Sequence, residues 1–358
     1  MGKLNLFLGL ICFLTISCET NHKTDEEVFI PVEKSELYAR LIGNSKGPIV
    51  VNLHGGPGGY SGFDHEFNRK HLEEDYLIVY LDQRGCGKSK EENDFSMLNM
   101  KQAVKDLDAV IGWISEKYPD RKINLLGGSW GGTLGLLYMI EHQDKINSFI
   151  CASGKADGIY PIKDLIDFER NLAMEKLNST NEQDSVRKYQ AMINKLNEIA
   201  ESNWDSLYDD VTLLKFTYPE KLGFNVYWAN KQALAEAVKL GKDSAYYKRA
   251  KYSKKQFEEA LRKGELVNQA FRNDSEYNHL NILSELSRIQ KPVLVLQGDQ
   301  DRAIGPKQAQ MIYNSLVNVP DDKKAIHILH NAAHNLNMEA EKEYYGYVKA
   351  FLQKENIK

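Results

Sequence analysis

The sequence has little cysteine, little net charge and no apolar run as long as a membrane span. Four of its 358 residues are cysteine, too few for a disulfide framework in a chain of this length. The 46 lysines and arginines nearly balance the 50 aspartates and glutamates, which leaves a net charge of −4. This balance does not favour a protein that binds nucleic acid. With 42% hydrophobic and 27% charged residues, the composition is that of a globular protein.

The longest apolar run lies at the N-terminus, at residues 4–16. It is shorter than the roughly 20 residues that span a bilayer, and it matches the apolar part of a secretory signal. Its end, LTISC, resembles a bacterial lipoprotein signal, in which Cys18 becomes the lipidated first residue. We therefore predict a lipoprotein-type signal peptide over residues 1–18, a polar linker over 19–26, and an exported protein anchored to the membrane through lipidated Cys18, in the periplasm or at the cell surface. Simple secretion is the alternative, because Thr15 stands where that signal usually has an aliphatic residue.

From Glu27 onward, short apolar segments alternate with helical patterns. Near-continuous apolar runs are typical of parallel strands buried on both faces. The alternation predicts an α/β domain over residues 27–153 and 291–358, with a mostly parallel eight-stranded sheet preceded by an antiparallel hairpin. The predicted strands are 27–33, 36–43, 48–55, 76–83, 122–128, 147–153, 292–299 and 324–330, and the predicted helices are 100–117, 132–142, 306–316 and 337–354.

Between residues 154 and 290 the alternation stops. This region is rich in amphipathic helical patterns, such as VRKYQAMINKLNEIAE. We interpret it as a helical cap inserted into the α/β domain.

The segment LLGGSWGGTL, residues 125–134, places Ser129 among four glycines directly after an apolar strand. Gly127, Ser129 and Gly131 form a G-x-S-x-G motif in a strand–turn–helix setting, which is typical of a nucleophile elbow. Glycines are needed there because side chains would block the sharp turn. Ser129 is therefore the candidate nucleophile, and it needs a general base and a group to orient that base.

Proteins with such an elbow carry the acid and the histidine on loops after later strands. Asp301 is the candidate acid because it stands three residues past Gly298, which ends a strand, and Asp299 is the alternative. His334 is the candidate base because it lies in the loop after the last strand, whereas the alternative, His330, still belongs to the strand end.

A serine nucleophile also needs hydrogen-bond donors for the oxyanion. The backbone amide of Trp130, the residue after the nucleophile, is one candidate. The second is the amide of Gly56 in HGGPGG, residues 54–59. We interpret His54, which heads this loop, as structural, and we expect Asp82 and Arg84 of the DQRG segment to hold the loops of this face together.

Three motifs in this order, HGGPGG (54–59), LDQRGCGKS (81–89) and GGSWGGTL (127–134), closely resemble the prolyl iminopeptidase family of serine aminopeptidases, which have the α/β-hydrolase fold. The resemblance implies Ser129, Asp301 and His334 as the triad and the Gly56 and Trp130 amides as the oxyanion hole. It also implies release of an N-terminal residue, often proline, from small peptides, without metal or organic cofactor. A carboxylesterase or lactone hydrolase acting on small esters is the alternative, since it needs the same triad.

Members of that family bind the free amino terminus of the substrate through cap glutamates, one of them in a Trp-Glu pair. Here Trp228 is followed by Ala229 and Asn230, so the chain departs from the family pattern at this point. Other glutamates of the cap that could supply the carboxylate are Glu169, Glu175 and Glu236.

Overall fold

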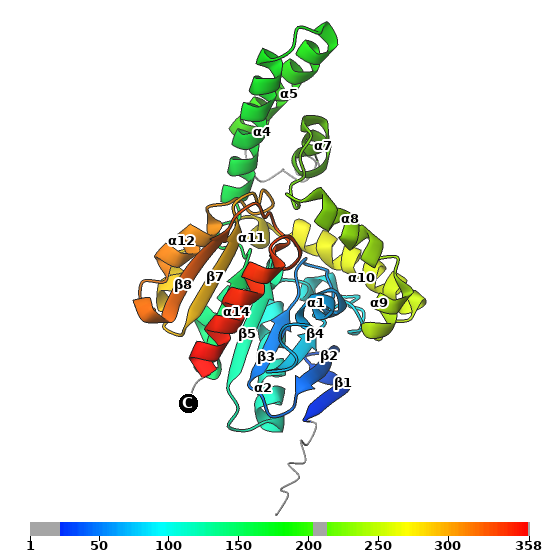
Figure 1. The fold of residues 1–358 in the computed structure, drawn as a ribbon, viewed down its shortest axis with the longest axis vertical. Coiled ribbons are helices and arrows are strands. Elements are labelled where there is room, and N and C mark those ends of the chain that lie inside the picture. The colour runs from blue at the N-terminus through cyan, green and yellow to red at the C-terminus, as the bar shows by residue number, and fades with distance from the viewer. Residues whose placement is uncertain (1–21, 203–212, 357–358) are drawn as a thin grey trace, which may run out of the picture.

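The computed structural model describes residues 22–202 and 213–356. Its centre is one sheet of eight strands in the spatial order β1-β2-β4-β3-β5-β6-β7-β8 (Figure 1). The strands are β1 (Lys23–Val32), β2 (Ser35–Asn44), β3 (Ile49–Leu53), β4 (Leu77–Leu81), β5 (Ile123–Gly128), β6 (Ser148–Ala152), β7 (Val293–Gly298) and β8 (Lys324–Leu329). Each lies where the sequence predicts a strand.

The sheet is antiparallel only at one edge. β1 pairs with β2, and β2 with β4, in antiparallel register, whereas the strands from β4 across to β8 pair in parallel. All residues of β3, β4 and β6 are buried, because helices cover both faces of a parallel sheet. The predicted fold class, a mostly parallel eight-stranded sheet with an edge hairpin, is confirmed.

Helices of the α/β domain cover this sheet (Figure 1). Their bounds are α1 (Ser61–Asn68), α2 (Met100–Lys117), α3 (Trp130–His142), α12 (Gln308–Ser315), α13 (Leu336–Glu339) and α14 (Glu341–Asn356). The prediction for α2 is correct to the residue, and the helix predicted over 337–354 is two helices with a break at Ala340. Sequence analysis missed α1, because its eight residues, SGFDHEFN, show no clear apolar periodicity.

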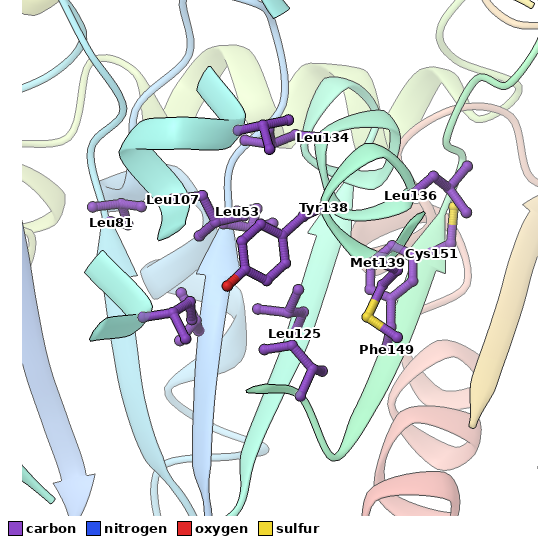
Figure 2. Packing of buried hydrophobic residues seen from close by; sticks show 14 of the residues in the cluster. Leu53, Leu81, Leu107, Leu125, Leu134, Leu136, Tyr138, Met139, Phe149 and Cys151 are labelled. Atoms are coloured by element: carbon purple, nitrogen blue, oxygen red, sulfur yellow. The ribbon is translucent and has the colours of Figure 1, made fainter. Parts of the chain in front are cut away.

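Alternate residues of each central strand supply two cores, one on each face of the sheet. Ile49, Val51 and Leu53 of β3 pack into the larger cluster with residues of α2 and α3, while Val50 packs into the second cluster with residues of α14. Figure 2 shows part of the larger cluster, where side chains of α3 lie over strands of the sheet. Burial of this apolar surface on both faces fixes the register of the strands that carry the site.

The segment between β6 and β7 is helical, as predicted, and forms two arms that leave the sheet in different directions (Figure 1). The first arm contains α4 (Tyr160–Asn178), α5 (Gln183–Glu201), the π-helical turn Leu213–Thr217 and α7 (Tyr218–Leu222). The second arm contains α8 (Lys231–Leu240), α9 (Ser244–Arg249), α10 (Lys254–Arg272) and α11 (Ser275–Asn278). Where the chain enters and leaves this cap, a bridge between Asp157 and Asn281 joins the two connecting segments.

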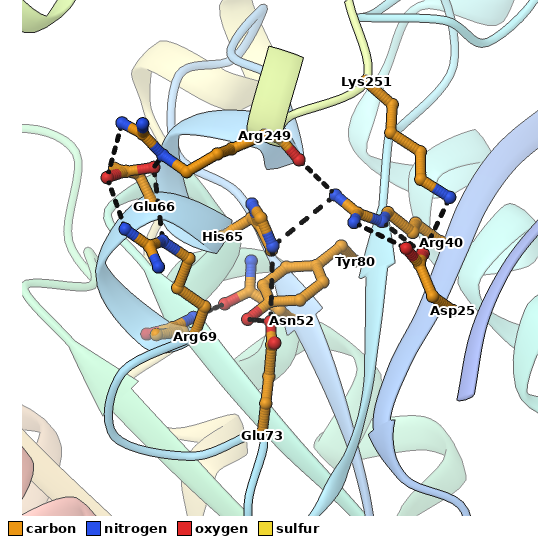
Figure 3. Close-up of polar contacts among 11 residues, drawn as sticks. Asp25, Arg40, Asn52, His65, Glu66, Arg69, Glu73, Tyr80, Arg249 and Lys251 are labelled. Atoms are coloured by element: carbon orange, nitrogen blue, oxygen red, sulfur yellow. Dashed lines mark hydrogen bonds and ion pairs between the residues drawn. The ribbon is translucent and has the colours of Figure 1, made fainter. Parts of the chain in front are cut away.

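Polar contacts fasten the second arm to the α/β domain (Figure 3). The Arg249 guanidinium donates two hydrogen bonds to Glu66 of α1, at 2.8 and 3.0 Å. Arg40 of β2 donates to the Arg249 carbonyl at 2.7 Å, and Lys251 pairs with Asp25 of β1 at 2.9 Å. The end of α9 and the connection that follows it are therefore held against α1 and the edge hairpin.

Some sequence predictions fall outside the described residues, namely the signal peptide over residues 1–18 and lipidation of Cys18. Over residues 22–202 and 213–356, no helix combines the length and the apolar composition needed to cross a bilayer. Cys86 and Cys151 are both buried and neither forms a disulfide.

Candidate active site

Ser129 stands at the sharp turn between β5 and α3. Its backbone has φ 54° and ψ −120°, a conformation that residues with side chains rarely adopt and that a nucleophile elbow requires. The flanking glycines allow the turn, because a Cβ on Gly127 would lie 2.2 Å from the Gly131 carbonyl oxygen and one on Gly131 would lie 1.9 Å from that of Leu53. The strain of the turn leaves the Ser129 hydroxyl at the carboxyl edge of the sheet.

The structure brings together the three residues predicted as a triad. His334 Nε2 lies 2.8 Å from Ser129 Oγ, and His334 Nδ1 lies 2.8 Å from Asp301 Oδ2. Ser129 follows β5, Asp301 follows β7 and His334 follows β8, so the ends of three parallel strands place them at one edge. This geometry suits proton transfer from the serine to the imidazole, oriented by the carboxylate. The catalytic roles themselves stay predictions.

Asp301 is fully buried, and both of its carboxylate oxygens accept hydrogen bonds. Besides His334, Oδ2 accepts a hydrogen bond from Gln297 Nε2 at 2.8 Å, and Oδ1 accepts from the amides of Ala303 and Ile304 at 2.9 and 3.3 Å. These hydrogen bonds prevent rotation of the carboxylate, so Asp301 holds the His334 ring in one orientation.

The alternative acid and base lie elsewhere. His330 is 82% exposed and pairs with Asp299, with 3.2 Å between Nδ1 and Oδ2. This pair lies at the solvent-exposed end of β8, and neither residue contacts Ser129 in the described structure. The geometry therefore favours Asp301 and His334 over Asp299 and His330.

The candidate oxyanion donors lie on either side of Ser129. Trp130 is the first residue of α3, so its amide has no acceptor within the helix. The loop 54–59 passes directly over the nucleophile, since a Cβ on Gly55 would lie 3.1 Å from Ser129 Cβ. No acceptor for the neighbouring Gly56 amide is found among the described residues. Within the described residues both amides are therefore available to an oxyanion, and the oxyanion-hole role of Gly56 and Trp130 stays a prediction.

Gln83, which sequence analysis missed, joins these two elements. Its amide nitrogen Nε2 donates to the His54 carbonyl at 2.9 Å, and its Oε1 accepts from Trp130 Nε1 at 2.7 Å. The Gln83 backbone amide donates to His54 Nε2 at 3.1 Å, while His54 Nδ1 lies 2.8 Å from the Gly55 carbonyl oxygen. Burial lowers the pKa of His54, which fits a neutral imidazole that shapes the loop, in the structural position predicted for it.

Asp82 and Arg84 hold loops of this face together, but not by pairing with each other. Asp82 is fully buried and accepts hydrogen bonds from the Ser61 amide, the Lys88 amide and the Tyr252 hydroxyl, at 2.7, 2.7 and 2.8 Å. Arg84 instead pairs with carboxylates of two other segments, those of Asp106 and Glu92, at 2.7 Å each.

The second arm also touches the candidate oxyanion loop. A Cβ on Gly58 would lie 2.1 Å from the carbonyl oxygen of Gly264 in α10, so the two backbones are in direct contact. Two glycines at this crossing are necessary, because a side chain at either position would push the loop and α10 apart. A shift of α10 would therefore also shift the loop above Ser129.

The three cap glutamates differ sharply in environment. Glu175 and Glu236 are exposed, whereas Glu169 on α4 is fully buried. Neither carboxylate oxygen of Glu169 has a hydrogen-bond partner, and burial raises its pKa to about 9. An unpaired buried carboxyl is costly, so Glu169 is a candidate for binding a donor group of a substrate.

Glu169 lies in an apolar cluster of the first arm that borders the triad. Leu165, Ile166 and Ala173, one turn to either side on α4, belong to this cluster, and so does Ala303, two residues after Asp301. Tyr227 packs against the same cluster, and its ring centroid is 5.6 Å from that of His334. The cluster that surrounds Glu169 thus reaches the edge of the candidate active site.

No cluster of three or more His, Cys, Asp or Glu side chains suited to a metal ion occurs in the described part of the chain. The arrangement around Ser129 suits attack of a serine oxygen on a carbonyl carbon.

A family model for the α/β hydrolase fold matches residues 48–341. The chain belongs to the α/β-hydrolase fold family. This hydrolase is 28% identical over 276 residues to a proline iminopeptidase of Lactobacillus acidophilus, across 76% of this chain and 81% of the relative. It is 36% identical over 127 residues to a proline iminopeptidase of Lactobacillus helveticus, across 35% of this chain and only 42% of that relative. Proline iminopeptidases are therefore homologues of this hydrolase.

Among solved structures, the hydrolase is similar to a proline iminopeptidase-related protein of Thermus thermophilus. The TM-score is 0.59 at 19% sequence identity, and the match covers 92% of this chain and 98% of that one. At this identity the likeness shows the fold alone.

Proposed function

We propose that this hydrolase releases N-terminal residues, of which proline is the type, from short peptides by acyl transfer through Ser129, His334 and Asp301. The hydrogen-bonded geometry of the three residues supports the acyl-transfer step, and the homologous proline iminopeptidases support a peptide substrate. The observation that carries the aminopeptidase assignment is Glu169, a buried carboxyl with no partner in the arm that borders the triad.

In the proposed mechanism, Ser129 Oγ attacks the carbonyl carbon of the first residue while His334 Nε2 takes its proton. The oxyanion accepts hydrogen bonds from the Gly56 and Trp130 amides, each of which contributes about 3 kcal/mol to stabilisation of the transition state. His334 then gives the proton to the leaving amine. Water, activated by the same imidazole, hydrolyses the acyl-enzyme and regenerates Ser129.

Glu169 binds the free amino group of the substrate in this proposal. Burial keeps the carboxyl neutral in the free protein near pH 7, because its pKa is about 9. An amine brought into the same apolar cluster shares a proton with the carboxyl, and either placement of that proton leaves both groups hydrogen-bonded. A substrate whose amine is acetylated cannot form this pair.

A carboxylesterase or lactone hydrolase is the second candidate. The absence of a glutamate after Trp228 favours it, since Trp228 is followed by Ala229 and Asn230. The Ala229 and Asn230 amides are instead bound by Glu339, which accepts at 2.6 and 2.8 Å. An esterase would need the triad but no amine-binding carboxylate.

The test compares three substrates: a proline arylamide, its N-acetylated form and a short acyl ester. We expect wild type to cleave the free-amine arylamide and not the acetylated one. Glu169→Gln should lower kcat/KM for the free-amine substrate about 10- to 100-fold, as for loss of a hydrogen bond to a charged group, and leave ester hydrolysis unchanged. Ser129→Ala should abolish all three reactions, with a loss of at least about 10⁴-fold.

Two outcomes would decide against this assignment. Ester hydrolysis without arylamide hydrolysis would replace the aminopeptidase by the esterase. Equal effects of Glu169→Gln on ester and arylamide would remove Glu169 from amine binding. A matched control is Glu236→Gln, because Glu236 is a glutamate of the same cap that is exposed.

We also propose that the protein is exported and anchored through lipidated Cys18. The apolar run at residues 4–16 followed by Cys18 supports this. Labelling cells with a radioactive fatty acid should mark the wild type and not Cys18→Ser, and label in both would exclude this site.

A further inference from the structure

The segment after β6 carries a lysine that the proposed mechanism does not use. Its path is fixed by contacts with the nucleophile elbow, since the Ser129 amide donates to the Ala152 carbonyl at 2.8 Å. The Lys155 amide donates to Thr133 Oγ1 in the first turn of α3, at 3.0 Å. The backbone of Lys155 is therefore held beside the helix that begins directly after Ser129.

The Lys155 side chain points over the aromatic residues next to the nucleophile. Its Nζ lies 3.7 Å from the centroid of the Tyr277 ring, a cation–π contact. The Tyr277 ring in turn packs edge-on against Trp130, with 5.5 Å between centroids. Because Trp130 follows Ser129 directly, one tyrosine separates the Lys155 ammonium from the residue next to the nucleophile.

Within residues 22–202 and 213–356, the Lys155 ammonium has no carboxylate within 4 Å and no hydrogen-bond acceptor. Asp157 is near, but its Oδ1 accepts from the amides of Ile159 and Tyr160, both at 2.8 Å. Burial and the charge of Lys215 lower the pKa of Lys155, and Asp157 opposes this shift, so that the resulting pKa is about 7. Lys155 is half-buried, and a partly desolvated charge is costly without a partner, so an anionic partner from outside the chain would stabilise the charged form of Lys155.

We propose that Lys155 binds a substrate carboxylate close to the scissile bond, which makes short anionic peptides the substrate class of this hydrolase. The inference rests on the proposed function in taking the substrate to be a peptide. The carboxylate has two possible sources, the free C-terminus of a dipeptide and the acidic side chain of the released residue. With Glu169 for the amine and Lys155 for the carboxylate, the site offers complementary groups to both charges of a dipeptide.

The experiment measures kcat/KM on substrate pairs that differ only in one carboxylate. Pro-Gly and Pro-Gly-amide test the C-terminus, and glutamyl and glutaminyl arylamides test the released side chain. In one of these pairs, we expect Lys155→Met to lower kcat/KM for the carboxylate-bearing substrate about 10- to 100-fold and for its neutral partner less than about twofold. Lys155→Arg should restore much of the loss, because it keeps the positive charge.

Lys263→Met is the matched control. Lys263 is also half-buried at the cap, but its Nζ donates to the Ser89 carbonyl at 2.7 Å. Lys263→Met should therefore change kcat/KM equally for the two substrates of each pair. Equal loss on both members of each pair with Lys155→Met, or no loss at all, would overturn the proposal.

A third pair separates this inference from the aminopeptidase proposal. A nitrophenyl hemisuccinate and a nitrophenyl butyrate are both esters, and only the first carries a carboxylate. If the wild type cleaves esters and not peptides, the proposed function fails, while a selective loss on the hemisuccinate with Lys155→Met would still support carboxylate binding. In that case, an unchanged ratio for the two esters would refute it.

Discussion

Two nearly fully buried glutamates show how differently the arms of the cap use charge. Glu66, at the contact of the second arm with α1, is 6% exposed, and Glu169, inside the first arm, is 0% exposed. Burial opposes the charge of Glu66, but hydrogen bonds from Arg249 and Arg69 lower its pKa overall. Burial acts alone on Glu169 and raises its pKa. The second arm is thus docked by charged groups that have hydrogen-bond partners, whereas the first arm contains a buried carboxyl that has none.

This difference assigns separate tasks to the arms. Satisfied, buried polar contacts fix one arrangement of neighbouring segments, and those of the second arm hold α10 against the loop that contains Gly56. An unsatisfied group costs stability unless a ligand completes it, which suits substrate selection. We therefore interpret the second arm as positioning the oxyanion loop and the first arm as recognising the substrate.

The largest effect is expected from replacing Asp82, which helps to hold the second arm against the α/β domain. Asp82→Ala leaves the Ser61 and Lys88 amides and the Tyr252 hydroxyl without their buried acceptor. We expect the free energy of unfolding to fall by about 3–5 kcal/mol, as when one partner of a buried charged contact is removed. Urea denaturation of wild type and variant measures this.

Tyr252→Phe is the control for Asp82→Ala, because it removes only the contact from the cap. It should cost about 1.5–3 kcal/mol, the contribution of one hydrogen bond to a charged group. A loss for Asp82→Ala no greater than that for Tyr252→Phe would mean that Asp82 does not hold the loops together.

A pH-dependent effect of intermediate size is expected at Glu169. Its folded pKa of about 9 lies above the unfolded value near 4.5, so unfolding releases a proton between these values and stability falls as pH rises. Glu169→Gln removes this fall in stability, because glutamine does not ionise. The variant should match wild type near pH 4 and exceed it by about 2–3 kcal/mol at pH 6.5, with the difference still growing at higher pH. Thermal or urea unfolding at several pH values checks the slope, and a constant difference across pH would contradict it.

Features of the fold and the site could be predicted from the sequence when they depend on residues that lie close together along the chain. The strands and the triad residues were predictable because apolar runs mark buried strands and the residues follow them at fixed positions. Gln83 and Lys155 were missed, since their roles depend on Trp130 and Tyr277, which are distant in sequence. Glu169 carried a local signal, because it lies three and four residues from Ile166 and Ala173 on the apolar face of α4.

The smallest effect is expected at the partly exposed ion pair between Arg249 of the second arm and Glu66 of α1. Arg249→Ala removes both hydrogen bonds to Glu66, but the Arg249 side chain is 34% exposed, so solvent screening limits the loss to about 1 kcal/mol. The lowered pKa of Glu66 means that this contribution is present above about pH 4.5 and is lost as pH falls. The difference between wild type and variant should therefore shrink in acid, opposite to the trend at Glu169.

Arg187→Ala provides the control for that measurement. Arg187 on α5 pairs with Asp184, but the two side chains are 72% and 80% exposed, so we expect no measurable loss. Urea denaturation at pH 7 and pH 4 distinguishes the cases. If Arg249→Ala behaved like Arg187→Ala, the ion pair with Glu66 would not dock the second arm, and the contact of α10 with the oxyanion loop would have to depend on Asp82 and Tyr252 instead.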